Sequence, residues 1–141
     1  MGQALEIQSI ESLMSGVAAV PGQKLQLMIG DTLRIKATIQ YRGAALNDYF
    51  YGAIGNKRLG VFDEIIYKQV AIQFALATTW VSYQLTVDIP LTSAISSGTD
   101  YDIYVKIKGH TEAGLPEVDN CIDILGAPEF QSFEITSYEK A

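Results

Sequence analysis

Apolar and polar residues alternate along most of this chain, and the pattern is most regular between Thr79 and Lys108. Every second residue from Val81 to Ile89 is apolar, and the residues between them are serine, glutamine, threonine and aspartate. The same alternation returns from Tyr101 to Ile107. Because successive side chains of a β-strand point to opposite faces, this period indicates two strands that each have one apolar face. Those faces require a second layer to cover them.

Further segments with short apolar alternation predict strands on both sides of this pair. They are residues 5–13, 24–29, 33–41, 48–55, 61–66, 70–76, 122–124 and 130–138. A helix over 65–77 suits the local alanine and glutamine content, but the two-residue period fits a strand better. Gly55–Arg58 is expected to form a hairpin turn, and residues 109–120 a long loop. The pattern predicts an all-β fold, a two-layer antiparallel β-sandwich.

The connection before Tyr101 has a distinctive spacing. Ile95 lies six residues before Tyr101, and Gly98 lies three residues before it. This resembles the connection between strands E and F of immunoglobulin-like and fibronectin type III domains. The resemblance implies an immunoglobulin-like topology, with the Tyr101 hydroxyl bonded to an upstream main-chain group and the ring in the core. The alternative is a plain core tyrosine at a strand start. Trp80 departs from the family pattern, because it begins the E-like strand rather than lying on strand B or C; we expect a structural role for it.

Composition and charge narrow the classes of partner. The chain has a net charge of −6 and is 48% hydrophobic, as expected for one globular domain. Its few basic residues do not form the patch that nucleic acid requires, so we expect no nucleic-acid partner. No apolar run approaches the ~18 residues of a membrane span, and no secretory leader is visible. We therefore expect no membrane insertion.

Residues able to carry catalysis or bind metal are few. Cys121 is the only cysteine and His110 the only histidine, which excludes an internal disulfide and disfavours a zinc site. Motifs for a hydrolase elbow, a P-loop or a dinucleotide site are absent from the sequence. Five acidic residues could supply calcium ligands, although a solvated strand face explains them better: Asp100, Asp102, Glu117, Asp119 and Asp123. We predict a non-enzymatic domain with no cofactor and no metal.

The best candidate for a binding surface is aromatic. Phe50 separates Tyr49 from Tyr51, so an inward Phe50 would place both tyrosines on the outer face of the strand. Exposed tyrosines suit sugar rings or protein partners. The alternative is that both tyrosines are core residues. Lys57 and Arg58 are candidates for the same ligand-binding surface, at the adjoining hairpin tip, although solvated charges are common there.

The two ends of the chain share a six-residue pattern. Glu6–Glu11 and Glu129–Glu134 both read glutamate, apolar, glutamine, serine, apolar, glutamate. We interpret residues 1–127 as an immunoglobulin-like β-sandwich and residues 128–141 as a terminal strand. That strand is either the start of a following repeat or an edge strand of the same domain. Its expected partners are neighbouring repeats or, through weak self-association, other copies of the chain.

These observations favour a non-catalytic structural, spacer or adhesion module of a larger extracellular, cell-surface or virion-associated protein. The alternative is a carbohydrate-binding module that uses the exposed Tyr49 and Tyr51. The partner would be a protein in the first case and a glycan in the second.

Overall fold

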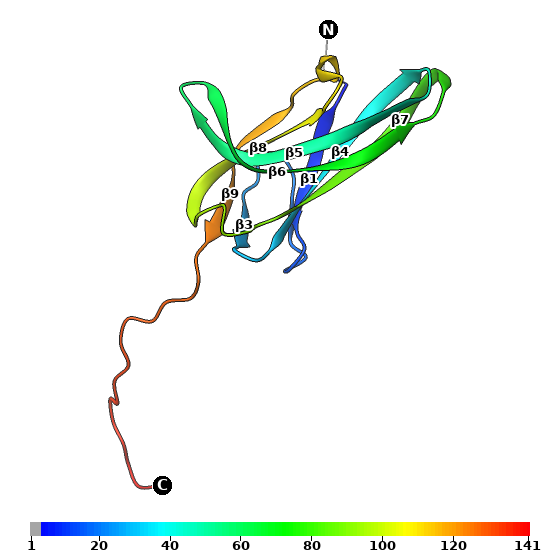
Figure 1. The fold of residues 1–141 in the computed structure, drawn as a ribbon. Coiled ribbons are helices and arrows are strands. Elements are labelled where there is room, and N and C mark those ends of the chain that lie inside the picture. Colours follow the sequence, from blue (N-terminus) through cyan, green and yellow to red (C-terminus); the bar gives the residue numbers. More distant parts are fainter. Residues whose placement is uncertain (1–3) are drawn as a thin grey trace.

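The computed structural model describes residues 4–141 and arranges their strands in two packed sheets (Figure 1). The first sheet has the order β2-β1-β4-β7 and contains β1 (Glu6–Ser12), β2 (Ala18–Ala19), β4 (Thr32–Gly43) and β7 (Ala77–Pro90). The second has the order β3-β9-β8-β5-β6 and contains β3 (Leu25–Met28), β5 (Leu46–Arg58), β6 (Val61–Phe74), β8 (Gly98–Ile107) and β9 (Glu117–Leu125). A short 3-10 turn, η1 (Thr111–Ala113), lies between β8 and β9. The predicted all-β, two-layer class is confirmed.

The core lies between the sheets and uses the alternating apolar positions. On β4, β7 and β8 most residues predicted to point inward are buried: Leu33, Ile35, Ala37, Ile39, Leu85, Val87, Ile89, Tyr101, Ile103, Val105 and Ile107. The exceptions lie toward one end of β4 and β7, where Tyr41 and Tyr83 are half-buried and Val81 is 39% exposed. Complete burial of an aliphatic side chain of this kind contributes about 1.5–3 kcal/mol. At Gly52 the sheets approach closely, because an added Cβ would lie 2.7 Å from Cγ1 of Val87.

One strand pair departs from the predicted antiparallel arrangement. β3 runs parallel to β9, with Leu25 opposite Ile122 and Leu27 opposite Ile124. The chain leaves the first sheet after β2 and crosses to the second, where β3 joins the edge beside β9. Leu25 and Leu27 are both buried, so the apolar pattern of this strand is satisfied in the parallel direction. Alternation alone does not distinguish the two directions.

The β5–β6 hairpin corrects two further expectations. Its turn is Leu59–Gly60, both with positive φ (51° and 79°), whereas the predicted turn residues Gly55–Arg58 belong to β5. Positive φ at both central residues is the pattern of a type I′ turn, whose twist matches that of a hairpin. The segments 61–66 and 70–76 form one strand rather than two, with a bulge where the register slips beside Ile54 and Gly55. The alternative helix over 65–77 does not form.

The last third of the chain differs in two places. β9 begins at Glu117, inside the region expected to be a loop. Residues 126–141 form no strand, although one was predicted over 130–138, and they run away from the sandwich (Figure 1). The strand pattern is therefore present there without a partner strand in this domain. Among the described residues, no helix is long and apolar enough to cross a membrane.

Candidate functional site

β5 places its tyrosines on the outer face of the second sheet. Phe50 and Ile54 point inward and are fully buried, so Tyr49 and Tyr51 stand on the opposite side. Tyr49 is 44% exposed and Tyr51 is half-buried. The orientation inferred from alternation is therefore observed, and the alternative that both are core residues does not hold. Their predicted role in binding stays a prediction.

Four aromatic residues meet around Tyr51 and form what we call the outer aromatic cluster: Tyr51, Phe62, Tyr67 and Tyr104. Tyr51 and Tyr67 are stacked, with ring centroids 5.0 Å apart. Tyr104 meets Tyr51 at 6.1 Å and Phe62 edge-on at 4.6 Å. The register explains the cluster, because Tyr67 on β6 and Tyr104 on β8 both lie opposite Ala53. The small side chain of Ala53 leaves room for the large rings on either side.

Glu64 is the acceptor that organises the hydroxyl groups of this cluster. The Tyr51 hydroxyl donates to Glu64 Oε1 at 2.7 Å, and the Tyr104 hydroxyl donates to the same oxygen at 3.0 Å. Burial and the neighbouring Glu64 carboxylate raise the pKa of Tyr104 to about 12, and the same two causes raise the pKa of Tyr51 further. Both phenols therefore stay protonated at neutral pH and act as donors. Glu64 is held in place through one oxygen.

Lys106 lies over the cluster from the β8 side. Its amine is 4.6 Å from the ring centroid of Tyr51 and 5.9 Å from that of Tyr104. Contact between a cation and a ring face is favourable by about 0.5–1 kcal/mol at an exposed site. The Tyr51 ring therefore contacts Tyr67 and Lys106, and it is not open for a ligand to stack on. This corrects the expectation that Tyr51 itself presents an open platform.

An open hollow of about 320 Å³ adjoins the cluster. Phe62 and Tyr104 supply its aromatic surface, and Glu64 and Lys106 supply polar groups of opposite charge. Thr111 and Leu115 border it from the connection between β8 and β9. The hollow therefore combines flat apolar area with a hydrogen-bond acceptor and a hydrogen-bond donor. Sequence reasoning missed its residues, because they come from three separate segments.

The other predicted binding residues do not join this hollow. Lys57 forms ion pairs with Glu117 at 2.8 Å and Asp119 at 3.5 Å, and the bond to Glu117 is the main reason that its pKa is raised. The Arg58 side chain is 80% exposed, with Asp63 at 3.9 Å. Tyr49 lies eight residues before Lys57 on the same strand, about 26 Å away at the usual rise. The four predicted residues Tyr49, Tyr51, Lys57 and Arg58 are therefore not one site.

The residues predicted to be structural divide into two groups. The buried Tyr101 donates its hydroxyl to the carbonyl of Ser96 at 2.6 Å, and Ile95 is buried beside this connection. A Cβ on Gly98 would lie 3.3 Å from the Tyr101 hydroxyl, so a glycine fits the close approach. Trp80 differs, because it is 60% exposed and carries the Arg42 guanidinium 4.4 Å above its ring. Its role is at the surface of β7, not in the core.

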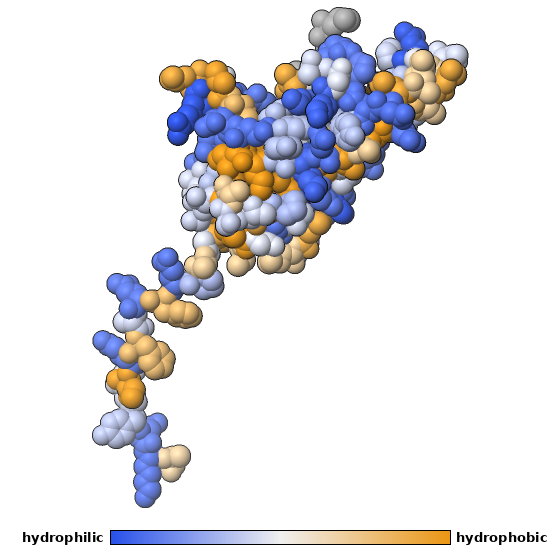
Figure 2. Space-filling view, in the orientation of Figure 1, coloured by the Kyte–Doolittle hydropathy of each residue, from blue (hydrophilic) through white to orange (hydrophobic). Residues whose placement is uncertain are grey.

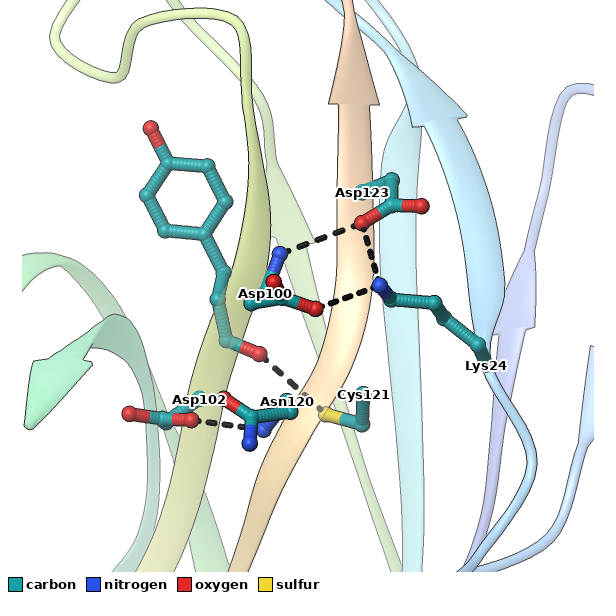
Figure 3. A network of polar contacts seen from close by, with 7 residues as sticks. Lys24, Asp100, Asp102, Asn120, Cys121 and Asp123 are labelled. Carbon is teal, nitrogen blue, oxygen red and sulfur yellow. Dashed lines mark hydrogen bonds and ion pairs between the residues drawn. The ribbon is translucent and has the colours of Figure 1, made fainter.

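The acidic residues considered for calcium are engaged with other groups of the protein, and Figure 3 shows three of them, Asp100, Asp102 and Asp123. Glu117 and Asp119 pair with Lys57, as described above. Lys24 bonds to Asp100 and lies 2.9 Å from Asp123. Asp102 is buried and accepts the backbone N–H groups of Lys57 at 2.8 Å and Asn120 at 2.6 Å. Within residues 4–141, no group of three or more histidine, cysteine, aspartate or glutamate side chains is placed to hold a metal ion.

Cys121 and His110 occupy separate environments. Cys121 is buried in β9, and its thiol donates to the carbonyl of Val118 at 3.4 Å. Burial raises the pKa of this thiol to about 12, which disfavours the thiolate that a nucleophile requires. The His110 Nδ1 atom instead contacts Asp48 at 2.7 Å. The two residues therefore do not form a nucleophile and base pair.

The structure itself defines the class of the chain, and comparison with known proteins adds no family to it. It is an all-β sandwich of two sheets; no family model matches the sequence, and no curated protein matches it. A similar solved structure is the C-terminal domain of wzt, with 11% sequence identity and a TM-score of 0.48. The match covers 99% of this chain and 85% of that domain. A likeness this low assigns neither family nor function.

Proposed function

We propose that this protein is a non-catalytic carbohydrate-binding module whose site is the hollow beside the outer aromatic cluster. The observation that carries the proposal is that Phe62, Tyr104, Glu64 and Lys106 line one open hollow. A sugar ring has an apolar C–H face and a rim of hydroxyl groups. Aromatic side chains pack against the apolar C–H face, and fixed charged groups form hydrogen bonds with the hydroxyl groups.

The hydrogen bonds of the cluster prepare Glu64 for this task. Both tyrosine hydroxyls end on Oε1, which leaves Oε2 available to accept from sugar hydroxyls. Lys106 is held over two rings and presents donors on the same hollow. A carboxylate fixed in advance avoids part of the ordering cost of binding, about 0.5–1.5 kcal/mol for each immobilised side chain. The open shape suits an extended glycan rather than an enclosed small molecule.

The non-catalytic part of the proposal has its own support. The thiol of Cys121 is buried and protonated, and His110 is occupied by Asp48. Neither residue lines the hollow. A binding role uses the residues that do line it without requiring a reacting group.

We also assign the sandwich to the immunoglobulin-like type. Two features support this assignment. Tyr101 makes the bond to Ser96 that the family resemblance implies. The strands β1, β4 and β7 face β9, β8, β5 and β6, as strands A, B and E face G, F, C and C′ in that topology.

Glycan-array screening of the full chain, followed by calorimetry with the sugars it retains, tests the proposal. Phe62→Ala and Glu64→Gln should each weaken binding strongly, because one removes ring area and the other the charge of the acceptor. Tyr49→Ala is the matched control, since Tyr49 lies on the same face but does not line the hollow. Each variant is first checked for an unchanged melting temperature. Saturable binding that persists in Phe62→Ala and Glu64→Gln, or no retained glycan, would overturn the assignment.

A spacer or adhesion role is the second candidate, and one observation favours it. Residues 126–141 project from the domain with apolar side chains exposed, as a segment that joins or contacts another module would. The two roles are compatible, because they use different surfaces.

A further inference from the structure

The segment after β9 has the side chains of a strand but no strand partner. Phe130, Phe133 and Ile135 are 95%, 98% and 82% exposed. The space-filling view shows apolar groups standing along this segment, clear of the folded domain (Figure 2). Burial of these three side chains would remove apolar surface from water, which is favourable. A segment of this kind is unusual at a free surface and suits docking.

The segment reproduces the pattern by which β1 packs onto β4. In β1 the register shifts between Ile7 and Ser9, so Gln8 is an extra residue. This bulge lets Ile7 and Ile10, three positions apart, both be buried. Phe130 and Phe133 have the same three-residue spacing within the same sequence frame. With a bulge at Gln131, the apolar side chains of residues 130, 133 and 135 share one face.

The first sheet offers an unprotected edge for such a strand. Among the described residues, β7 has β4 as its only strand neighbour. From Val81 to Ile89 its register with β4 is unbroken and its sequence contains no lysine, arginine or proline; Pro90 lies at one end of the strand, and a register shift beside Tyr41 and Gly43 at the other. The open stretch of the edge is therefore Val81–Ile89. Asp88, its single charged residue, is paired with Arg34 at 2.8 Å. Natural edge strands are normally protected by lysine, proline, bulges or short length.

The other long edge is better protected. β6 has a bulge at Ile65 and carries Lys68, whereas β2 and β3 are short. Inward-facing residues near the β7 edge are also incompletely covered, because Val70 on β6 and Val81 on β7 are each 39% exposed. A strand added beside β7 would cover apolar surface as well as pair backbone groups.

The reach of the chain decides which molecule provides the strand. β9 is separated from the far edge of its sheet by β8, β5 and β6, about 15 Å at the usual strand spacing. The β7 edge lies a further sheet separation of about 10 Å away. From Leu125 at the end of β9 to Glu129, where the β1-like pattern begins, the chain spans at most about 14 Å, less than these two offsets combined. The segment therefore does not reach the β7 edge of its own domain.

We propose that residues 129–136 of one molecule add as a strand to the open β7 edge of a second copy of this chain. Main-chain hydrogen bonds supply pairing, and the face of Phe130, Phe133 and Ile135 covers the exposed apolar residues at that edge. The donor and acceptor lie on different surfaces of each molecule, so the contact is head-to-tail and extends to chains of molecules at high concentration. The inference does not depend on the proposed glycan site.

Sedimentation velocity of the full chain over a wide concentration range tests the proposal. We expect a concentration-dependent shift to dimers and longer species. Phe133→Glu combined with Ile135→Glu should abolish the shift, because charges would face the apolar edge. Ser132→Glu combined with Thr136→Glu adds the same charge on the other face and should retain it. All four substituted residues are exposed in the segment that runs away from the sandwich, so we expect each variant to keep the folded domain.

Hydrogen exchange measured at low and high concentration locates the contact. Amides of residues 129–136 and of β7 should gain protection together, and β6 should not. A monomer at every concentration, or association that survives Phe133→Glu with Ile135→Glu, would overturn the proposal. Protection that is confined to β6, or that does not change with concentration, would rule out the β7 edge of a second copy.

Discussion

Replacing Tyr101 by phenylalanine removes one hydroxyl from the start of β8 and leaves the ring in place. That hydroxyl donates to the Ser96 carbonyl at 2.6 Å, while the residue as a whole is buried, with 6% exposure. The substitution therefore isolates the bond that ties the β7–β8 connection to the sandwich. Its loss is expected to destabilise the native state without altering core packing.

The loss of unfolding free energy depends on whether the Ser96 carbonyl finds another hydrogen-bond donor after the substitution. A typical hydrogen bond contributes about 0.5–1.5 kcal/mol net, and a buried acceptor left unsatisfied costs about 1–3 kcal/mol. Ser96 is an exposed residue, so water can reach its carbonyl once the hydroxyl is gone. The lower range applies, and we expect a loss of about 1 kcal/mol. For a domain of this size that corresponds to a decrease in melting temperature of about 3–5 °C.

Urea unfolding followed by fluorescence, together with a thermal melt, measures the effect. Tyr138→Phe is the matched control, because Tyr138 is 95% exposed and should show no change. An unfolding midpoint for Tyr101→Phe equal to that of the control would refute the idea that this bond stabilises the connection. A loss several times larger would show that the Ser96 carbonyl is shielded from water.

Two further predictions concern packing and pH. Gly52→Ala should destabilise the protein by about 1–3 kcal/mol in urea unfolding, because its Cβ would lie 2.7 Å from the Val87 side chain; a gain in stability would show that the sheets adjust freely. The bond to Asp48 raises the pKa of His110, although burial opposes it. For Asp48, burial favours a higher pKa, but the bonds from His110 and two backbone N–H groups outweigh it, so this pKa is lowered. Protonated His110 stabilises the folded state fully below about pH 6.5, and this stabilisation is lost as the pH rises through the raised pKa of His110. Ionised Asp48 stabilises the folded state above about pH 4, and this stabilisation is lost as the pH falls through the lowered pKa of Asp48. The stability difference between wild type and His110→Gln should therefore be greatest between about pH 4 and 6.5, at about 0.2–1 kcal/mol, because the His110 side chain is 42% exposed and solvent screens the pair. A difference that grows at alkaline pH would contradict the pairing.

Alternation predicted the core because burial acts residue by residue along a strand. In β4, β7 and β8 each inward position could be assigned from its own segment, and the connection before Tyr101 carried its own local spacing. The direction of β3 could not be assigned, because an apolar strand packs equally well beside a parallel or an antiparallel neighbour. The turn at Leu59–Gly60 was hidden, since leucine rarely adopts positive φ and Gly55-Asn56 is a commoner turn pair.

The candidate site was only partly visible in the sequence, because it depends on pairing between strands. Tyr49 and Tyr51 could be placed on the outer face from the position of Phe50. Tyr67 and Tyr104 could not be joined to them, since their meeting opposite Ala53 is set by the register on both sides of β5. That register itself depends on the bulge at Ile65. A signal was present in the alternation of β8, which puts Tyr104 on the face opposite the core.

β8 contributes to both the core and the proposed binding site, and it places their residues on opposite faces. Its inward residues Ile103 and Val105 are fully buried, whereas Tyr104 and Lys106, which alternate with them, reach the outer cluster. Since successive residues point to opposite sides, substitutions of the outer pair alter the hollow without removing core contacts. A weakening of glycan binding in such variants, at an unchanged unfolding free energy, is therefore attributable to the hollow. β8 is hydrogen-bonded to β5 on one side and to β9 on the other, so Tyr104 projects from a strand that is paired along both edges.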